Sequence, residues 1–395
     1  MRTLTPLPEP SHAALEHSQA LKRLIQAEIA AAGGWISFER YMRLALYAPG
    51  MGYYSAGAEK FGQAGDFVTA PEISSLFGRT LARQAAQVLG LINEEADILE
   101  FGAGTAKLTL DLLLELERLG NLPAHYFILE VSAELRQRQR RMLEEHAAHL
   151  LPRVLWLERL PAEFNGLILA NEVLDAMPVH LVAWRDDNLF ERGIICDDNE
   201  FQWRERPLEE GELFAAAREL NPLIGERSEG AGYISEINLS AQYFIHGLAD
   251  ILQKGAILLI DYGFGRREYY HPQRSRGTLM CHYRHFAHDD PFYLPGLQDI
   301  TAHVDFSAIA DMAAKDGLTL LGYNTQAHFL INCGITGILA RIPAENTGEY
   351  LPLANQLQKL VSPAEMGELF KAIAFGRNIS GPLAGFASGD KSRLL

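Results

Sequence analysis

Short runs of apolar residues alternate with helical patterns through the middle of the chain. Each run lacks the alternating polar residues of a half-exposed strand, so it predicts a strand buried on both faces. These runs span residues 97–101, 126–129, 154–157, 166–170 and 256–260. Between them, residues 105–119 and 133–149 are apolar at helical spacing. Strands that alternate with helices predict an α/β fold with a parallel sheet and right-handed crossovers.

The chain around this region predicts elements of other kinds. Residues 179–207 alternate apolar and polar positions around polar turns, which predicts antiparallel hairpins inserted as a cap. Residues 266–304 are aromatic and rich in His, Arg and Pro without clear periodicity, which predicts a functional loop or lid. Helices are predicted at 13–32, 38–47, 74–89, 240–253 and 306–315, strands at 318–323 and 328–331, and a glycine-rich loop at 57–71.

These elements predict four consecutive regions of the chain. Residues 1–90 form an N-terminal helical segment with the glycine-rich loop, and residues 91–178 form the first part of a Rossmann-like core. Residues 179–238 form the inserted cap, and residues 239–395 form the remainder of the core, including the lid at 266–304.

Composition narrows the classes of partner and compartment. The 395 residues carry a formal net charge of −15, which opposes binding to nucleic-acid phosphates and suits a cationic partner such as a basic protein segment. Three distant cysteines, Cys196, Cys281 and Cys333, indicate a reducing compartment without disulfides. No apolar run reaches the roughly 18 residues that span a bilayer, and the N-terminus lacks targeting patterns. We therefore expect a cytoplasmic protein that binds neither nucleic acid nor membrane.

The strongest local motif is DILEFGAGTAK at residues 97–107. It places Glu100 at the end of a buried strand, and Gly102 and Gly104 in the turn into a helix, where glycine allows the backbone to approach a ligand closely. Lys107 stands where the dinucleotide fingerprint has its third glycine, and an acid before the glycines would repel a phosphate. The motif therefore favours S-adenosylmethionine (SAM), which presents a sulfonium, an amino group and a ribose. A turn that needs glycine only for packing is the alternative.

Two further predicted strands end in polar residues. Glu130 follows the strand at 126–129, where a carboxylate can accept both ribose hydroxyls; an exposed strand terminus is the alternative. Glu172 and Asp175 follow the strand at 166–170, where they could hold a cationic substrate or act as a base. Capping of a helix N-terminus is an equally good interpretation of these two acids.

An early glycine-rich segment supplies two more acids, and a later one supplies potential metal ligands. Asp66 and Glu72 lie in GDFVTAPE, which no periodic pattern explains; taken alone, it is equally a turn with a helix cap. Four residues of the types that bind zinc crowd into a short stretch: Cys281, His282, His285 and His288. Their spacing matches no zinc-ligand pattern, so we expect no metal site.

Seven segments form distinctive motifs: ISFERYMRLALY (36–47), GYY (52–54), GDFVTAPEIS (65–74), NEVLDAMP (171–178), IDYG (260–263), GTL (277–279) and DITAHVDF (299–306). With the glycine motif, they resemble the SAM-dependent methyltransferase family whose mitochondrial member assists assembly of respiratory complex I, the MidA family. The resemblance covers nearly the whole chain. It departs at Ala106, where the family often has a further glycine, but alanine is small enough for cofactor binding to survive.

The resemblance implies a class I methyltransferase core, with a seven-stranded sheet, helices on both sides and a final antiparallel strand. It implies that residues 100–104 cradle the methionine part of SAM and that Glu130 holds the ribose. The mitochondrial relative is regarded as a protein arginine methyltransferase, which implies a protein arginine as acceptor. The cofactor-binding residues expected are Glu100, Gly102, Ala103, Gly104, Thr105, Glu130 and Asn171.

A guanidinium acceptor sets a particular demand on the site. It is a poor nucleophile because its pKa exceeds about 12 and its lone pairs are delocalised, and two carboxylates can grip it and localise its charge. A small-molecule O- or N-methyltransferase and a SAM-binding assembly factor without catalysis remain alternatives; a dehydrogenase is disfavoured by the incomplete fingerprint. The candidate carboxylates are Asp66, Glu72, Glu172 and Asp175, with Asp261 and His303 as weaker candidates.

Overall fold

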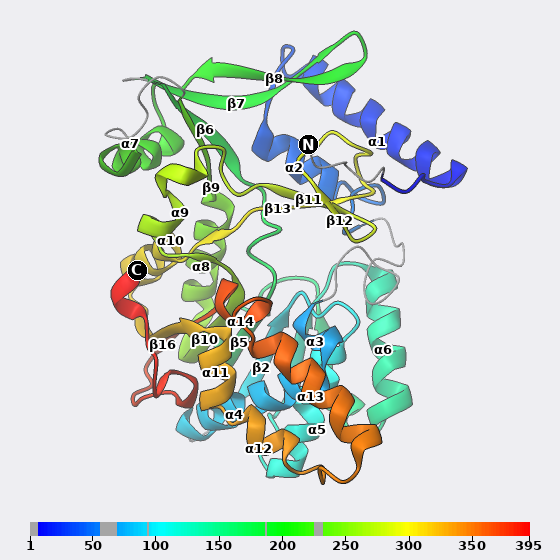
Figure 1. Ribbon diagram of the computed structural model, residues 1–395, viewed down its shortest axis with the longest axis vertical. Helices are drawn as coiled ribbons and strands as arrows, with labels where there is room; N and C mark the ends of the chain where they lie inside the picture. Colours follow the sequence, from blue (N-terminus) through cyan, green and yellow to red (C-terminus); the bar gives the residue numbers. More distant parts are fainter. Residues whose placement is uncertain (1–6, 56–68, 93–94, 186–187, 225–231) are drawn as a thin grey trace. The chain divides into compact units, whose positions relative to one another are not determined.

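A computed structural model describes residues 7–55, 69–92, 95–185, 188–224 and 232–395. The chain divides into two compact units, which are treated separately below (Figure 1). The hairpin unit comprises residues 1–67, 175–241 and 267–303, and the sheet unit comprises residues 68–174, 242–266 and 304–395. Each unit is therefore assembled from three separate stretches of chain.

The sheet unit is built on a sheet with strand order β15-β16-β10-β5-β2-β3-β4. The strands from β10 to β4 are parallel, and β16 runs antiparallel to both β10 and β15. A short strand, β14 (Val304–Asp305), also pairs with β10. The seven strands are β2 (Asp97–Phe101), β3 (Tyr126–Leu129), β4 (Val154–Leu157), β5 (Phe164–Asn171), β10 (Leu252–Phe264), β15 (Thr319–Thr325) and β16 (Phe370–Arg377). The predicted parallel sheet is present, and its antiparallel strand agrees with the arrangement that the family resemblance implies.

Helices cover both faces of this sheet. On one face Ile98 of β2 and Leu167 of β5 join the core that contains α4 and α5. Phe101, which points to the other face because strand side chains alternate, meets Phe244 of α8 with ring centroids 5.0 Å apart. The helices are α3 (Ala70–Ile73), α4 (Ser75–Ile92), α5 (Lys107–Leu119), α6 (Ala133–Ala147), α10 (Phe306–Lys315), α11 (Gln326–Asn332), α12 (Ile335–Leu339), α13 (Thr347–Val361) and α14 (Met366–Leu369), with α8 (Leu239–Ile251) beginning in the hairpin unit.

A buried ion cluster fixes α5 on this unit. Glu115, whose side chain is 1% exposed, is bound by Arg118 and Arg341 at 2.8 Å each and by Arg79 at 3.5 Å. Burial acts to raise the pKa of Glu115, but the hydrogen bonds and charges of Arg118 and Arg341 outweigh it and hold the pKa at about 2. These four residues are called the Glu115 cluster below.

The hairpin unit contains the predicted antiparallel strands. Its sheet has the order β1-β7-β6-β9, with β8 paired to β7. Helices α1 and α2 pack on this sheet through Leu21, Ile25 and Phe38, which share a core with Ile194 of β7. The elements are α1 (His12–Ala31), β1 (Ile36–Ser37), α2 (Phe38–Tyr47), β6 (His180–Arg185), β7 (Asn188–Asp197), β8 (Glu200–Pro207), α7 (Glu212–Ile224) and β9 (Tyr233–Ile237).

Two predictions of local structure are wrong. Residues 266–304, predicted as a loop, contain α9 (Arg266–Tyr269) and a three-stranded sheet of β11 (Met280–Tyr283), β12 (Phe286–His288) and β13 (Asp299–Thr301). These elements are three or four residues long, too short to show a period. Residues 328–331, predicted as a strand, lie in α11, whose first turn is capped by the side chain of Thr325. An apolar run of four residues does not distinguish a strand from a buried helix.

Among the described residues, no helix combines the length and the apolar character needed to cross a membrane.

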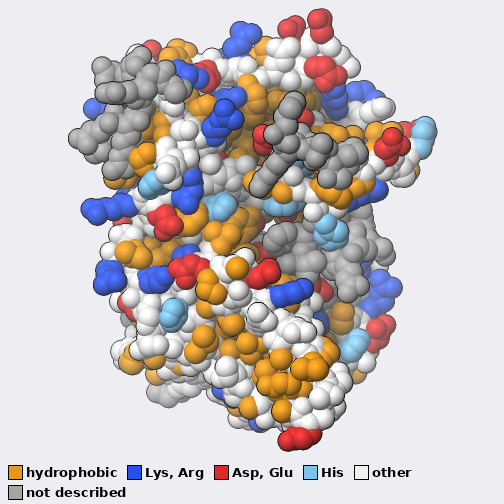
Figure 2. Space-filling view, viewed as in Figure 1, with side chains coloured by type: hydrophobic (Ala, Val, Ile, Leu, Met, Phe, Trp, Pro, Cys, Tyr) orange, Lys and Arg blue, Asp and Glu red, His pale blue; other side chains and the backbone are white. Residues whose placement is uncertain are grey.

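The most apolar area in Figure 2 lies over α13, where Leu351 is 54% exposed and Leu360 is the single buried residue. Acidic and basic side chains are interspersed over the face shown in Figure 2, so the negative charge of the chain is not gathered there into one patch.

Candidate functional site

The glycine motif forms a sharp turn between β2 and α5 in the sheet unit. Gly102 and Gly104 have φ of 66° and 51°, in the left-handed region that glycine adopts at little cost. A Cβ at Gly102 would lie 2.7 Å from Val173 Cγ2, whereas one at Gly104 would meet nothing within 4 Å. Ala106 also has a left-handed φ, 67°, which costs a non-glycine residue about 1–2 kcal/mol. The turn is therefore open on the side of Gly104 where a Cβ would stand.

Glu100 lies beneath this turn with its side chain buried. It is 1% exposed, and its Oε2 accepts hydrogen bonds of 2.6 Å from Thr109 Oγ1 on α5 and from Tyr126 Oη on β3. Burial raises the pKa of Glu100 to about 7, and the two hydroxyl donors act in the opposite direction. Glu100 thus ties β2 to its neighbours. Its predicted contact with a cofactor stays a prediction.

Glu130 lies at the end of β3, as predicted. Its Oε1 accepts a hydrogen bond of 2.8 Å from the Ser132 backbone N–H, and its Oε2 accepts one of 3.3 Å from Gln139 Nε2. Burial raises the pKa of Glu130, and these donors oppose the rise. Each carboxylate oxygen has two lone pairs, so both retain capacity for a further donor such as a ribose hydroxyl.

Glu72 and Glu172 approach the glycine turn from two other elements. Thr105 Oγ1 in the turn donates a 2.5 Å hydrogen bond to Glu72 Oε1 on the short helix α3. The Ala70 N–H at the start of α3 donates a 3.2 Å hydrogen bond to Glu172 Oε1, which lies just after β5. The structure therefore brings Glu72, Glu172 and Thr105 together around α3, at the carboxyl ends of β2 and β5.

Asn171 ends β5 beside Glu172. It is 8% exposed, and its Nδ2 donates a 3.1 Å hydrogen bond to Glu172 Oε1. Its Oδ1 is buried and has no hydrogen-bond partner among the described residues. Glu172 itself has a left-handed φ of 54°, and unusual backbone conformations of this kind concentrate at functional sites. Neither Glu172 nor Asp175 begins a helix, so capping does not explain these acids.

The remaining candidate acids lie elsewhere. Asp66 is outside the described residues. Asp175 belongs to the hairpin unit and is 6% exposed. Both carboxylate oxygens of Asp261 on β10 accept hydrogen bonds from backbone N–H groups. Oδ2 accepts from the Leu174 N–H at 2.9 Å, and Oδ1 accepts from the Tyr262 N–H at 2.8 Å. Asp261 therefore holds the chain that follows β5.

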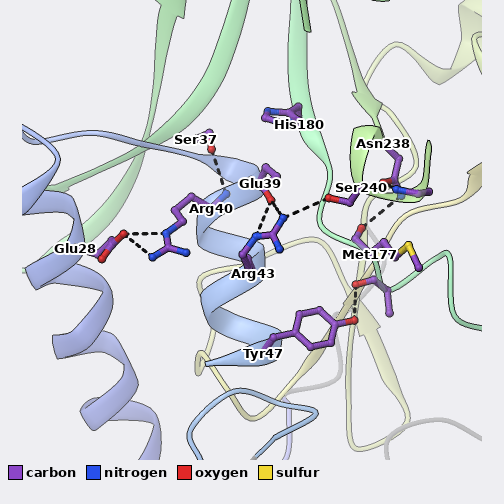
Figure 3. A network of polar contacts seen from close by, with 12 residues as sticks. Glu28, Ser37, Glu39, Arg40, Arg43, Tyr47, Met177, His180, Asn238 and Ser240 are labelled. Atoms are coloured by element: carbon purple, nitrogen blue, oxygen red, sulfur yellow. Dashed lines mark hydrogen bonds and ion pairs between the residues drawn. The ribbon is translucent and has the colours of Figure 1, made fainter. Parts of the chain in front are cut away.

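The segment after Asp175 is fixed within the hairpin unit by three hydrogen bonds to successive carbonyl oxygens. The oxygen of Asp175 accepts from the Ala302 N–H at 3.0 Å. Tyr47 Oη donates to the oxygen of Ala176 at 3.0 Å, and Asn238 Nδ2 donates to that of Met177 at 3.5 Å (Figure 3).

The motif at 36–47 supplies this tyrosine and the ion pairs that anchor its helix. Arg40 on α2 pairs with Glu28 on α1 at 2.7 Å, and Arg43 contacts both Glu39 and Ser240 (Figure 3). These contacts connect α2 to α1 and to the start of α8, so they fix the helix that presents Tyr47 to the segment after Asp175.

The GTL motif has a structural explanation in the hairpin unit. Glu236 is 1% exposed, and its Oε1 accepts hydrogen bonds from the backbone N–H groups of Thr278 at 2.8 Å and Leu279 at 2.9 Å. Thr278 Oγ1 in turn accepts from the His303 N–H at 3.0 Å. A Cβ at Gly277 would lie 2.2 Å from Glu236 Oε1, so an alanine there would displace the Glu236 carboxylate. His303 thus enters this network through its backbone.

No group of three or more His, Cys, Asp or Glu side chains is arranged to hold a metal ion in the part of the chain that the structure describes. A cavity of about 510 Å³ lies at the carboxyl end of β4, next to the strand that carries Glu130. It is lined by Trp156, Leu157, Glu158, Arg159, Leu160 and Pro161. The strand ends of the sheet unit therefore combine an open glycine turn, a carboxylate and a cavity.

Comparison with known proteins decides the family. The profile of a family of S-adenosyl-L-methionine-dependent methyltransferases matches residues 80–324. The chain belongs to this family. Its fold is the Rossmann-like class I methyltransferase fold, its cofactor is SAM, and the sequence-based predictions of fold, enzyme class and cofactor are confirmed. The match spans both units, including the turn, Glu130 and the candidate acids after β5.

Individual relatives agree with this assignment. A Burkholderia thailandensis protein solved with bound S-adenosyl-homocysteine is 51% identical, covers 99% of this chain and 100% of its own, and superposes with a TM-score of 0.94. The mitochondrial protein arginine methyltransferase NDUFAF7 of Danio rerio is 30% identical over 89% of this chain and 85% of its own length. The Mus musculus protein of the same name is 29% identical over 86% and 81%. These curated relatives are mitochondrial, which contradicts the cytoplasmic location expected from the sequence.

Proposed function

We propose that this methyltransferase modifies the guanidinium of a protein arginine, with Glu72 and Glu172 gripping the acceptor. The observation that carries the proposal is the attachment of both carboxylates to the same short helix, α3, directly beside the glycine turn. The relatives named protein arginine methyltransferases support the same acceptor. A role for Asp66 and Asp175 in catalysis stays a prediction made from the sequence motifs that contain them.

The residues at the strand ends fit the chemistry of SAM. The buried, unpartnered Asn171 Oδ1 is an acceptor that suits the amino group of the methionine part, and the free space beside Gly104 lets the cofactor approach the backbone of the turn. Glu130 offers two oxygens to the vicinal ribose hydroxyls. The neighbouring strand, β4, carries Trp156, which lines the cavity. When bound, SAM supplies a methyl group on a positively charged sulfur. We therefore propose Gly102, Ala103, Gly104, Thr105, Glu130 and Asn171 as the binding residues, with Glu100 supporting the turn from below.

The carboxylates have two tasks at a guanidinium. Paired hydrogen bonds from the planar guanidinium orient it, and the nearby negative charge localises its positive charge on one side. A guanidinium nitrogen that the carboxylates do not bind would then gain nucleophilic character, and it would release one proton as it takes the methyl group that SAM supplies. Glu172 is suited to this task because donors from Ala70 and Asn171 hold its Oε1 in place. Glu72 is held in the same manner by Thr105.

The proposal is tested with Glu72→Gln and Glu172→Gln, which keep the side-chain shape and remove the charge. Isotope-labelled SAM is supplied with a library of arginine-containing peptides, and methylarginine is measured by mass spectrometry. We expect each variant to lose about a hundredfold or more in turnover, while its affinity for S-adenosyl-homocysteine stays within about twofold of wild type. Glu144→Gln, on the exposed side of α6, is the matched control and should keep full activity.

Two results would contradict the proposal. If either glutamine variant turned over at the wild-type rate, that carboxylate would not grip the acceptor. If the wild-type enzyme methylated small molecules but no arginine in the library, the acceptor would be a small molecule instead.

A further inference from the structure

A buried amide on α6 connects three neighbouring strand ends, those of β2, β3 and β4, at the proposed cofactor site. Gln139 is 0% exposed. Its Nε2 donates hydrogen bonds to the backbone oxygen of Gly104 at 3.1 Å and to Glu130 Oε2 at 3.3 Å, and its Oε1 accepts from Trp156 Nε1 at 2.8 Å. Gln139 was not among the residues expected from the sequence, where it is one polar position in a predicted helix.

The orientation of this amide is determined by its neighbours. The indole N–H of Trp156 can only donate, so the amide oxygen must face Trp156. The amide nitrogen must then face Gly104 and Glu130, which both offer acceptors. Both hydrogens of the nitrogen are used, so the group has one favourable arrangement.

The three partners of Gln139 come from three consecutive strands. Gly104 lies in the turn after β2, Glu130 follows β3, and Trp156 lies on β4 and lines the cavity there. A rigid side chain that joins these points fixes their separation. The proposed SAM site includes both the glycine turn and Glu130, so their separation determines whether both can bind the cofactor at the same time.

We propose that Gln139 is a positioning residue for SAM: it holds the Glu130 carboxylate and the glycine turn in the relative placement that binds the cofactor. This inference rests on the proposed cofactor site. Without the amide, the Gly104 oxygen and Glu130 Oε2 lose a shared donor, and the two segments can shift independently. Gln139 itself remains beneath the site, so its effect is transmitted through Glu130 and Gly104.

A buried glutamine elsewhere in the same unit provides the control for loss of packing and hydrogen bonds. Gln84 on α4 is also 0% exposed; its Nε2 donates to Gln87 Oε1 at 2.9 Å, and its Oε1 accepts from the Gly385 N–H at 2.8 Å. It has the same chemistry as Gln139 but none of its partners lies at the cofactor strand ends. Gln139→Met and Gln84→Met both replace an amide by an unbranched apolar side chain of similar length.

The experiment is calorimetric titration of the full chain with S-adenosyl-homocysteine. We expect Gln139→Met to raise the Kd at least about tenfold, which corresponds to about 1.4 kcal/mol, and Gln84→Met to leave it within about twofold. Gln139→Glu keeps the acceptor for Trp156 but turns a second carboxylate towards Glu130, so we expect an equal or larger loss. If Gln139→Met does not fold, the affinity of Gln139→Glu for S-adenosyl-homocysteine tests whether Gln139 positions the cofactor site.

A double-mutant cycle separates positioning from general destabilisation. If Gln139 acts through Glu130, the double variant Gln139→Met with Glu130→Gln raises the Kd by less than the product of the two single increases. For the control pair, Gln84→Met with Glu130→Gln, we expect the two increases in Kd to multiply. Wild-type affinity in Gln139→Met, or independent effects of Gln139 and Glu130, would overturn the inference. Absence of S-adenosyl-homocysteine binding by the wild type would instead refute the proposed site itself.

Discussion

Replacing Glu100 by glutamine tests the account of the carboxyl beneath the glycine turn. Burial raises the pKa of Glu100 to about 7 from its usual 4.5, although Thr109 and Tyr126 both donate to it. A gap of this size corresponds to about 3 kcal/mol between the protonated and ionised forms in the folded chain, at about 1.4 kcal/mol per pKa unit. Glutamine keeps the shape and can accept the same two hydroxyls, but it cannot ionise.

The sign of the effect follows from proton binding. Because the folded-state pKa is raised, the unfolded chain releases this proton near pH 4.5 and the folded chain keeps it until about pH 7. Wild-type stability therefore falls as pH rises through this window, and Glu100→Gln lacks that fall. We expect the free energy of unfolding of the variant, relative to wild type, to increase by about 2 kcal/mol from pH 5 to pH 8.

Urea denaturation of both proteins at pH 5 and pH 8 measures this difference, and other titrating groups cancel in the comparison. A difference between variant and wild type that is the same at both pH values would refute the reasoning. It would mean that Glu100 is ionised in the folded chain despite its burial.

Two further predictions concern stability. Glu115→Gln should lower the free energy of unfolding by about 2 kcal/mol at pH 7. This loss should shrink as pH falls from 4.5 towards the folded-state pKa of Glu115, about 2. If urea denaturation gave an equal loss at pH 7 and pH 3, the stabilising role of the Glu115 cluster would be contradicted. Gly277→Ala should cost at least about 1 kcal/mol more than Gly34→Ala, because both have left-handed φ but only Gly277 faces Glu236 Oε1. Equal shifts in melting temperature would count against a close contact at Gly277.

The sequence predicted two kinds of element: helices long enough to show a repeating apolar stripe, and strands that form a mostly apolar run. Strands β2, β3 and β4 and helices α2 and α10 have the bounds expected from the pattern. These segments lie in the core, where burial alone imposes an apolar run or a helical stripe. The short strands β11 to β13 carry no such signal, because three or four residues are too few to show a period.

The candidate site could be predicted only as far as chain topology extends. A parallel sheet brings the residues after each strand to one edge, which is why the sequence predicted that Glu130 and Glu172 lie there. Topology does not show where a side chain points, so the inward orientation of Glu100 and its hydroxyl partners were not foreseen. Gln139 was missed for a related reason: its importance comes from contacts 17 and 35 residues away in sequence.

The central claim is that Glu130 and the glycine turn bind the cofactor, and calorimetric titration with S-adenosyl-homocysteine tests it most directly. The proteins are the wild type, Glu130→Ala and the matched control Glu134→Ala, which removes a half-exposed carboxylate paired with Arg138 four residues further along. The account predicts micromolar binding by the wild type and the control, and binding weakened at least about tenfold by Glu130→Ala, because a bidentate acceptor is lost. Equal affinity in Glu130→Ala and wild type would contradict it.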